Sequence, residues 1–577
     1  MFLEKSGFFV YVCTHITKTQ GIMIEKNGIS NDKMTFPSVF TRTVSNFGER
    51  NAYTFVGEEP ITYNEAYASI KAIMAFLENN GVKSGDKVAI LSLNMPNWGL
   101  AYFSITFMGA IVVPILPDFS AIEVRNVLEH SESKAVFVST SLMNKLEGYR
   151  NETLKTVIQI ENFSIISHEG TPYAFNNSDE SKNKYEIEED DLASIIYTSG
   201  TTGRSKGVML THKNIVLSGM NGRRIQWIDE NDRFLSILPL SHTYENTLGL
   251  ILPLLGGACV YYLRKPPSPA VLLPALEVVK PTLVLSVPLI IEKIYFNKIL
   301  PTFRDNAVLN ILYKIPVFRK ALSRAAGKKL EVTFGGNLKF FGVGGSKLNK
   351  TVERFLYEAK FPYSIGYGLT EMAPLIAGAA PGRQVLESTG PVVEEHQLTI
   401  HNPDPKTGEG EVWVKGACVM KGYYKEPEIT KETITPDGWL KTGDLGTMDK
   451  KNNLFIKGRL KTMIVGASGE NIYPEEIESV INNFRYVVES LVIEKKGKLV
   501  AMVHLNMEEF EQKYQDLKEG MSEKIEEKKQ ELIAELKEYV NAHVSKFCQI
   551  YKVELQPVPF QKTATDRKST RLNSSHT

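Results

Sequence analysis

The chain has 577 residues, more than one hydrophobic core usually fills, so we expect two or more domains. Hydrophobic residues make up 43% and charged residues 23%, a composition typical of a folded globular protein. With 67 Lys and Arg against 66 Asp and Glu the net charge is +1, which argues against a nucleic-acid-binding protein and favours small-molecule partners.

The cysteines and the apolar runs bear on where the protein works. The four cysteines are far apart and form no Cys-x-x-Cys pair, which argues against a zinc site or a disulfide framework and predicts a reducing cytoplasm. The apolar runs Ala101–Pro117 and Thr247–Leu263 contain prolines or paired glycines, so we expect buried helix and strand rather than membrane spans. A lipid substrate would favour peripheral contact with a membrane, although the sequence offers no anchor.

Residues 1–35 are interpreted as an N-terminal extension, with Met23 or Met34 as alternative native starts. The apolar run in this extension, Gly7–Cys13, is too short for a convincing signal peptide. We therefore begin the folded protein at about residue 36.

From there to Asp191, helical patterns alternate with short β-rich runs, which predicts an α/β domain with parallel strands. The pattern resumes after residue 208. The predicted strands include Lys87–Leu91, Lys134–Val138, Phe234–Leu238, Leu283–Ser286 and Leu338–Gly342. Each ends near a Gly, Pro or Ser cluster, where open α/β sheets place their ligands.

Residues Tyr197–Val208 combine five Ser and Thr hydroxyls, three glycines and two cations, directly after the apolar run Leu192–Ile196. Glycine lets backbone N–H groups turn toward one point, hydroxyls add donors, and Arg204 and Lys206 add positive charge. The stretch predicts a polyphosphate cradle, with a solvated Ser/Thr/Gly turn as the alternative. A Walker loop is excluded because its Gly-x-x-x-x-Gly-Lys-Ser/Thr spacing is absent.

A second cluster is Gly366–Glu371, preceded by Gly344, Gly345 and Ser346. An aromatic ring between glycines can present its face to a base, while a nearby hydroxyl and carboxylate can reach phosphate and a hard cation. By itself this pattern is a moderately common turn.

Beyond about residue 390 the sequence pattern changes to short β-like runs, which predicts a small β subdomain over about 390–455. A third cluster follows there, with Asp444 in Trp439–Gly446 and Arg459 just before Lys461. Asp444 alone could cap a turn. The apolar spacing in Met507–Tyr551 predicts an amphipathic helix, broken at Gly520, that packs on its own domain.

The three clusters together resemble the adenylate-forming superfamily, which includes acyl-CoA synthetases. The stretch Thr198–Gly207 is similar to its phosphate loop, Thr-Ser-Gly-Thr-Thr-Gly-x-x-Lys-Gly, and Tyr367–Glu371 to its Tyr-Gly-x-Thr-Glu motif. The resemblance covers about residues 36–565. It implies a large N-terminal domain of doubly wound α/β sheets over 36–460, with the small β subdomain, hinged to a small α+β C-terminal domain over 461–565.

The resemblance also implies roles for single residues. Lys206, Thr370, Glu371 and His242 would be catalytic, with Glu371 holding Mg²⁺ and His242 lining the boundary of the acyl pocket. Lys461 would be the hinge, and Gly469 would line the path of CoA. The nucleotide would contact Thr198, Ser199, Gly200, Thr201, Thr202, Gly203, Gly344, Gly345, Ser346, Tyr367, Gly368, Thr370, Asp444 and Arg459. A lone His is more often structural, and Gly469 by itself is a turn glycine.

The implied reaction uses ATP, Mg²⁺ and CoA to turn a hydrophobic carboxylic acid, a medium- or long-chain fatty acid, into an acyl adenylate and then an acyl-CoA. One alternative is adenylation followed by transfer of an acyl or amino-acyl group to a carrier protein. Another, of a different class, is a nucleotide-binding protein without catalysis.

The end of the chain departs from the family pattern. The family ends with Pro-Lys-Thr-x-x-Gly-Lys, and here Arg567 stands where the last lysine belongs. One back-translation of residues 566–576 reproduces a widely used DNA sequencing adaptor. We therefore expect that residues 566–577 are an artefact and that the native lysine is missing.

Replacing Asp566 and Arg567 by the family's Gly-Lys is expected to raise the rate of pyrophosphate release, because that lysine is implied to steer the carboxylate and phosphate during adenylation. A coupled pyrophosphate assay measures the gain. An unchanged rate, or a clean gene copy that encodes Asp566–Thr570 in frame, would count against the hypothesis.

Overall fold

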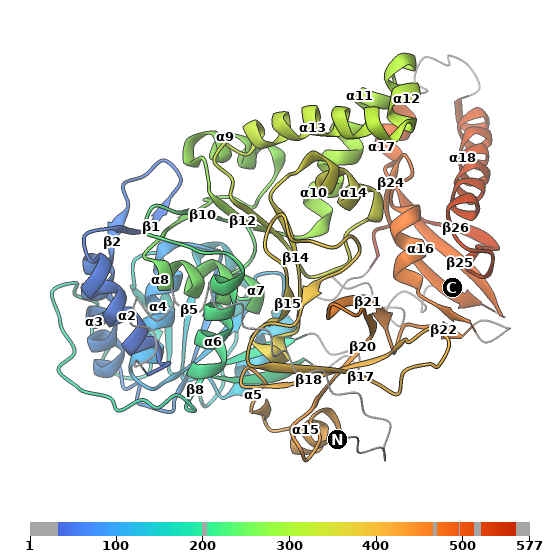
Figure 1. Cartoon of the computed structure of the whole chain (residues 1–577). Coiled ribbons are helices and arrows are strands. Elements are labelled where there is room, and N and C mark those ends of the chain that lie inside the picture. Colours follow the sequence, from blue (N-terminus) through green and yellow to red (C-terminus); the bar gives the residue numbers. More distant parts are fainter. Residues whose placement is uncertain (1–32, 199–204, 466–469, 496, 513–520, 561–577) are drawn as a thin grey trace, which may run out of the picture. The chain divides into compact units, whose positions relative to one another are not determined.

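The computed structural model describes residues 33–198, 205–465, 470–495, 497–512 and 521–560. The chain divides into two compact units (Figure 1). Unit 1 comprises Met1–Asn402, Trp413–Thr442 and Met448–Phe455, and unit 2 comprises Pro403–Val412, Gly443–Thr447 and Ile456–Thr577. The domain boundary at 460/461 and the hinge at Lys461 stay predictions.

Unit 1 contains two eight-stranded mixed sheets. The first has the order β19 (Gly422–Tyr423), β9 (Lys206–Thr211), β8 (Leu192–Thr198), β4 (Ile111–Ile115), β3 (Lys87–Leu91), β5 (Ala135–Val138), β6 (Thr156–Gln159), β7 (Ile165–His168). Its inner strands β8, β4, β3, β5 and β6 run parallel. All four residues of β5 are buried, as expected for a parallel strand covered on both faces.

The second sheet has the order β15 (Leu375–Gly378), β14 (Tyr363–Gly368), β13 (Phe340–Val343), β12 (Leu283–Ser286), β10 (Arg233–Ser236), β11 (Cys259–Tyr262), β1 (Asn51–Phe55), β2 (Ile61–Thr62). Only its edge strands β15 and β2 run antiparallel to their neighbours. Because β10 to β14 are parallel, their carboxyl ends share one edge of the sheet.

Helices connect these strands. They are α2 (Phe36–Phe47), α3 (Tyr63–Asn79), α4 (Pro96–Phe107), α5 (Ala121–Ser131), η2 (Thr140–Leu146), α6 (His212–Ile225), α7 (Thr243–Glu245), η3 (Asn246–Ile251), α8 (Leu252–Gly256), α9 (Pro269–Val279), α10 (Pro288–Ile294), η4 (Tyr295–Ile299), α11 (Leu300–Arg304), α12 (Ala307–Lys314), α13 (Pro316–Thr333), α14 (Lys350–Ala359), η5 (Thr370–Met372) and α15 (Pro427–Thr433). Capping boxes at Thr62, Ser120 and Thr211 start α3, α5 and α6.

The two apolar runs that the sequence assigned to buried helix and strand are confirmed. The first contains the end of α4, buried along most of its length, and β4. The second contains η3, α8 and β11. Within the described part of the chain, none of the helices has both the length and the hydrophobicity needed to cross a bilayer. The cytoplasmic location stays a prediction.

A further sheet has the order β16 (Gly390–Pro391), β21 (Asn453–Arg459), β20 (Leu440–Met448), β18 (Gly410–Gly416), β17 (His396–His401). The boundary between the units passes along the chain within β18, β20 and β21. Strands therefore occupy the stretch where the sequence indicated short β pieces.

Unit 2 contains a three-stranded sheet, β24 (Val487–Lys495), β25 (Lys498–Leu505) and β26 (Lys552–Gln556), and a two-stranded one, β22 (Ile464–Val465) and β23 (Asn471–Ile472). Its helices are α16 (Pro474–Ile481), α17 (Met507–Gln512), α18 (Met521–His543) and η6 (Lys546–Cys548). Leu532, Leu536 and Val540 of α18 are buried in the same core as Ile477 and Ile481 of α16. The prediction that this amphipathic helix packs on its own domain is confirmed.

The expected extent of that helix, to Tyr551, is wrong, because α18 ends at His543. The side chain of Asn541 turns the chain back. Its Oδ1 accepts from the backbone N–H of Ile550 at 2.8 Å, and its Nδ2 donates to the Ile550 carbonyl at 3.1 Å. The chain then enters β26. The predicted α/β class with a large N-terminal domain is confirmed, and the structure adds that its two large sheets are mixed.

Candidate functional site

The predicted phosphate loop connects β8 to β9. Thr198 ends β8 and faces Lys206, the first residue of β9, in the antiparallel register of the two strands. Ser199, Gly200, Thr201, Thr202 and Gly203 lie outside the described residues. The structure therefore places the two ends of this predicted nucleotide site.

Lys206 lies in a cluster with Tyr423 and Glu371. The Lys206 ammonium nitrogen lies 5.0 Å from the centre of the Tyr423 ring, a cation–π distance. The Tyr423 hydroxyl donates a hydrogen bond of 2.8 Å to Oε1 of Glu371. The structure thus links the predicted phosphate-binding cation to the predicted metal-binding carboxylate through one phenol.

Backbone pairing fixes Tyr423 in this position. Strand β19 runs antiparallel to β9, with Tyr423 opposite Val208 and Gly422 opposite Met209. On the Glu371 side, the backbone N–H of Met420 donates to the Glu371 carbonyl at 2.9 Å. Two chain segments that are distant in sequence are therefore held against β9 by main-chain bonds.

The environment of Tyr423 keeps its phenol neutral. Burial raises the pKa of Tyr423 far above its ordinary value, and the negative charge of Glu371 raises it further. The hydroxyl therefore remains a donor at every physiological pH. A carboxylate offers about four lone-pair directions over two oxygens, so one bond from Tyr423 fixes the group and leaves capacity for a cation.

The Glu371 carboxylate fits the predicted role as a Mg²⁺ ligand. Mg²⁺ is usually held by one or two carboxylates together with water and substrate phosphates rather than by an all-protein cage. In the described part of the chain, no group of three or more His, Cys, Asp or Glu residues could hold a metal alone. A single placed carboxylate is the arrangement expected where phosphates complete the coordination.

The Tyr367 segment lies at the carboxyl end of β14. Tyr367 and Gly368 are its last residues, and η5 follows with Thr370 and Glu371. A Cβ on Gly368 would lie 2.1 Å from the Pro374 carbonyl oxygen, so only glycine fits there. This close approach fixes the turn that leads from β14 to Glu371.

The Gly344 loop follows β13 and packs against the segment after β10. A Cβ on Gly344 would lie 3.1 Å from the Tyr244 ring, which leaves little room for a larger residue. Gly345 has a φ of +87°, a backbone conformation that favours glycine, and Ser346 beside it is exposed. The structure thus brings two of the predicted glycines to the same sheet edge as Tyr367.

His242 caps α7, and its Nδ1 accepts from the backbone N–H of Tyr244 at 3.2 Å. This contact gives the imidazole a local structural role. Two residues beyond the end of α7, Thr247 donates to the Ala373 carbonyl at 3.0 Å, which ties the His242 segment to the turn after Glu371. His242 as an acyl-pocket residue stays a prediction.

In unit 2, Asp444 and Arg459 form an ion pair with 3.1 Å between Oδ1 and Nε. The Asp444 side chain is 5% exposed and that of Arg459 is 34% exposed. Lys461 is exposed in the turn after β21. Gly469, predicted on the CoA path, lies outside the described residues. The two predicted nucleotide contacts of this unit are adjacent, and their roles stay predictions.

Sequence reasoning missed Tyr423 and the buried network around Asn94. The Asn94 amide donates to Ser236 Oγ at 2.9 Å and to the Leu238 carbonyl at 2.6 Å, and its Oδ1 accepts from the Leu240 N–H at 2.9 Å. Ser236 in turn donates to the buried Glu245 carboxyl at 2.6 Å.

Burial raises the pKa of Glu245 to about 8, so this carboxyl is mostly protonated at neutral pH. The network braces the segment that carries His242. Tyr423 and Asn94 belong to no motif that the sequence analysis recognised. Their partners become visible only in the folded structure.

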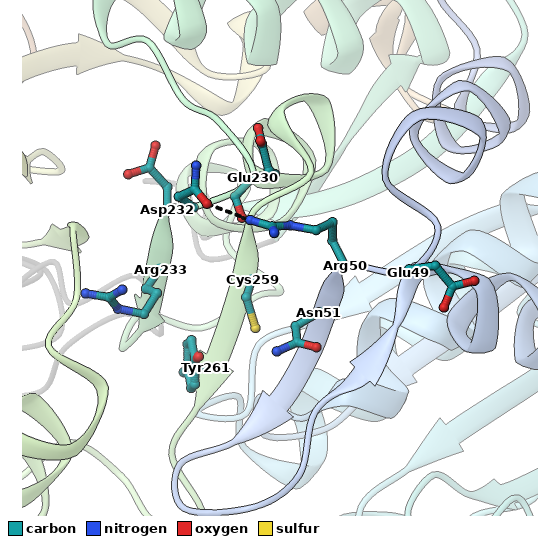
Figure 2. A pocket seen from close by; sticks show the side chains of 9 residues that line it. Glu49, Arg50, Asn51, Glu230, Asp232, Arg233, Cys259 and Tyr261 are labelled. Atoms are coloured by element: carbon teal, nitrogen blue, oxygen red, sulfur yellow. Dashed lines mark hydrogen bonds between the residues drawn. The ribbon is translucent and has the colours of Figure 1, made fainter.

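Figure 2 shows a polar hollow that does not belong to this site. It lies at the amino ends of β1, β10 and β11, whereas ligands of open α/β sheets bind at the carboxyl ends. Arg50 already donates to Asn231 Oδ1 at 2.6 Å across it. The residues lining the hollow are Glu49, Arg50, Asn51, Glu230, Asn231, Asp232, Arg233, Cys259 and Tyr261.

Comparison with known proteins decides the family. The model of the AMP-binding enzyme family matches residues 40–424, which hold the phosphate-loop ends, Tyr367 and the cluster of Lys206, Tyr423 and Glu371. The chain belongs to the AMP-binding enzyme family. The resemblance that the motifs indicated is confirmed.

Relatives within the AMP-binding enzymes are acid–CoA ligases. The chain is 30% identical over 484 residues to the long-chain-fatty-acid–CoA ligase FadD15 of Mycobacterium bovis, covering 78% of each chain. It is 29% identical to the Drosophila melanogaster long-chain-fatty-acid–CoA ligase heimdall, over 74% of this chain and 68% of that one. It is 30% identical to 4-coumarate–CoA ligase 2 of Nicotiana tabacum, over 76% and 78%.

Solved structures share the fold. O-succinylbenzoate CoA synthetase (MenE) of Bacillus subtilis, in complex with its acyl-adenylate intermediate, has a TM-score of 0.71 at 22% identity and covers 92% of this chain and 97% of its own. The anthranilate CoA ligase AuaEII has a TM-score of 0.72 at 19% identity, over 95% and 98%. The reaction class at this level is ATP-dependent acyl-adenylate formation and CoA ligation.

Replacing Tyr423 by Phe is expected to lower kcat/KM for ATP-dependent pyrophosphate release by about ten- to a hundredfold, because a hydrogen bond to a charged group contributes about 1.5–3 kcal/mol. Tyr424→Phe is the matched control, since the Tyr424 hydroxyl lies 3.4 Å from Glu132 in the same segment. If Tyr423→Phe and Tyr424→Phe have equal activity and equal thermal midpoints, Tyr423 has no role in the reaction.

Proposed function

We propose that this protein activates a hydrophobic carboxylic acid, a medium- or long-chain fatty acid, to an acyl adenylate and then to an acyl-CoA. The observation that carries the reaction is the cluster of Lys206, Tyr423 and Glu371 inside the matched family region. The acyl class is supported by the fatty-acid ligases among the relatives that share about 30% identity over most of both chains.

In the first step a carboxylate oxygen of the acid attacks the α-phosphorus of ATP. The bond to the bridging oxygen of pyrophosphate breaks, and the acyl adenylate remains. In the second step the CoA thiolate attacks the acyl carbon, and AMP leaves with the bonding electron pair. Neither step needs a covalent enzyme intermediate, so the protein contributes positioning and charge stabilisation.

Each residue of the cluster has a distinct task in this proposal. Lys206 supplies positive charge at the mouth of the β8–β9 connection, where the leaving pyrophosphate would gain charge. Glu371, fixed by Tyr423, would hold Mg²⁺, which supplies charge neutralisation on the phosphates. Thr370 beside it offers a hydroxyl donor to phosphate.

The remaining nucleotide contacts follow the family pattern. Tyr367 would stack on the adenine, and Asp444 would accept from the ribose hydroxyls. The ion pair with Arg459 would orient the Asp444 side chain for that task. A hinge at Lys461 would let unit 2 present different residues, including Gly469, in the two steps.

The chain after His242 is a buried and mostly apolar segment tied to the turn after Glu371. Every residue of η3 and α8, from Asn246 to Gly256, is buried. The π-helical segment η3 is a local irregularity of the kind often found at functional sites. This supports an apolar acid, although the 4-coumarate ligases among the relatives make an aromatic acid the competing substrate class.

The substrate class is tested with the chain in which Gly-Lys replaces Asp566 and Arg567. Saturated fatty acids of increasing length are expected to give the highest kcat/KM for AMP formation, and the rate is expected to depend on CoA. A higher kcat/KM for 4-coumarate than for any fatty acid would replace the proposed fatty-acid substrate by an aromatic acid. AMP formation without CoA dependence would favour a carrier-protein acceptor, and nucleotide binding without AMP formation would favour a non-catalytic protein.

Replacing Lys206 by Ala is expected to lower kcat/KM for ATP roughly a hundredfold or more, because removing one donor from a developing oxyanion costs about 2.7–4 kcal/mol. Lys213→Ala, on nearby α6, is the matched control, because it removes a lysine that pairs with Glu189. Intact ATP affinity and turnover in Lys206→Ala would contradict the assignment of the phosphate loop.

A further inference from the structure

Helices α12 and α13 expose a set of large apolar side chains to solvent. The exposed fractions are 65% for Val308, 64% for Ile311, 43% for Ile315, 75% for Val317 and 48% for Phe318. None of the residues of α12 is buried, although most of them are apolar. A helix of this composition normally buries one face, so the apolar face of α12 lacks the cover that such helices have in a core.

The spacing puts these side chains together. Val308 and Ile311 are three residues apart, which places them on one face of α12, and Ile315 follows directly after the end of that helix. Pro316 begins α13, and Val317 and Phe318 follow it in the first turn. The five residues form an apolar strip along the chain, at α12 and the start of α13. Figure 1 labels both helices.

The inner face of α13 is firmly packed, so the strip is a property of a fixed element. A Cβ on Gly327 would lie 2.7 Å from Cβ of Ala359, which shows how closely α13 approaches α14. The Arg319 guanidinium donates two ways to Glu358, at 2.8 Å from Nη2 and 3.1 Å from Nε to the same oxygen. Leu330 joins the core beneath the sheet.

The solvent face of α13 adds positive charge beside the strip. Its exposed charged residues are Lys320, Arg324, Lys328 and Lys329, and no acidic residue on this helix is exposed. From Pro288 to Thr333 the chain has nine Lys and Arg against three Asp and Glu, whereas the whole chain has 67 against 66. The positive charge is therefore local to these helices.

Apolar side chains rimmed by cations on a helix are the pattern of an interfacial membrane element. Nucleic acid fits less well, because single strands are bound by stacking aromatic rings and the strip consists mainly of branched aliphatic side chains. A second copy of this chain fits less well too. A two-fold contact through this face would bring the same cations against one another.

We propose that the outer surface of α12 and α13 docks on an anionic lipid bilayer. Val308, Ile311, Ile315, Val317 and Phe318 enter the boundary between headgroups and acyl chains, and Lys320, Arg324, Lys328 and Lys329 contact lipid phosphates. Binding at this docking surface needs neither ATP nor an acid, so it stands or falls independently of the substrate class.

The test measures binding of the full chain, without ATP, to phosphatidylcholine vesicles and to vesicles that also contain phosphatidylglycerol. We expect co-sedimentation with the anionic vesicles, weakened by high salt. The charge reversal Lys320→Glu/Arg324→Glu/Lys328→Glu is expected to weaken it about tenfold or more, since each cation contributes separately. The pair Val317→Ser/Phe318→Ser is expected to weaken it as well.

Matched variants on other exposed positions are the controls. Lys83→Glu/Lys182→Glu/Lys184→Glu changes the charge equally, and Ile122→Ser/Ile166→Ser removes equally exposed apolar groups. They are expected to bind like the unaltered chain. No binding to anionic vesicles at low salt, or equal losses in the controls, overturns the proposal. If the unaltered chain does not bind vesicles but self-associates, and Val317→Ser/Phe318→Ser abolishes the self-association, the surface belongs to a contact with a second copy.

Discussion

The pairing of β19 with β9 is the constraint on which the site in unit 1 depends. It sets Tyr423 beside Lys206 and within hydrogen-bonding distance of Glu371, three residues that come from separate segments of the chain. Main-chain hydrogen bonds hold this register, so the geometry does not rest on flexible side chains. Because Tyr423 is buried and neutral, it can orient the carboxylate without adding a charge that would compete with a cation.

Close approach at two glycines complements that pairing. Gly368 passes the Pro374 carbonyl where no Cβ fits, and Gly344 lies against the Tyr244 ring. Together with the bond from Thr247 to Ala373, these contacts draw the segments after β10, β13 and β14 to one edge of the sheet. The backbone of those segments has little freedom to move, and it therefore fixes the positions of their side chains relative to one another.

How far the sequence predicts this structure depends on the range of the interactions. Strands β3 and β12 were predicted with their observed bounds, because buried parallel strands are continuous apolar runs. The end of α18 was missed because it rests on the contact of Asn541 with Ile550. Tyr423 was missed for a similar reason, since its partner Glu371 is 52 residues away. Local motifs located the site, and tertiary contacts completed it.

The net charge of the whole chain likewise differs from the charge of one of its stretches. A balance of +1 over the chain hides a basic stretch in α10 to α13, where apolar side chains also face solvent. The packing of α13 against α14 explains why Val317 and Phe318 do not face inward. The small residues Gly327 and Ser323 of α13 already occupy its packed face. The packing of α13 therefore keeps Val317 and Phe318 on its solvent side. Uncovered apolar surface persists in a folded protein chiefly where another phase or partner covers it, and a bilayer that supplies negative charge satisfies both parts of this surface.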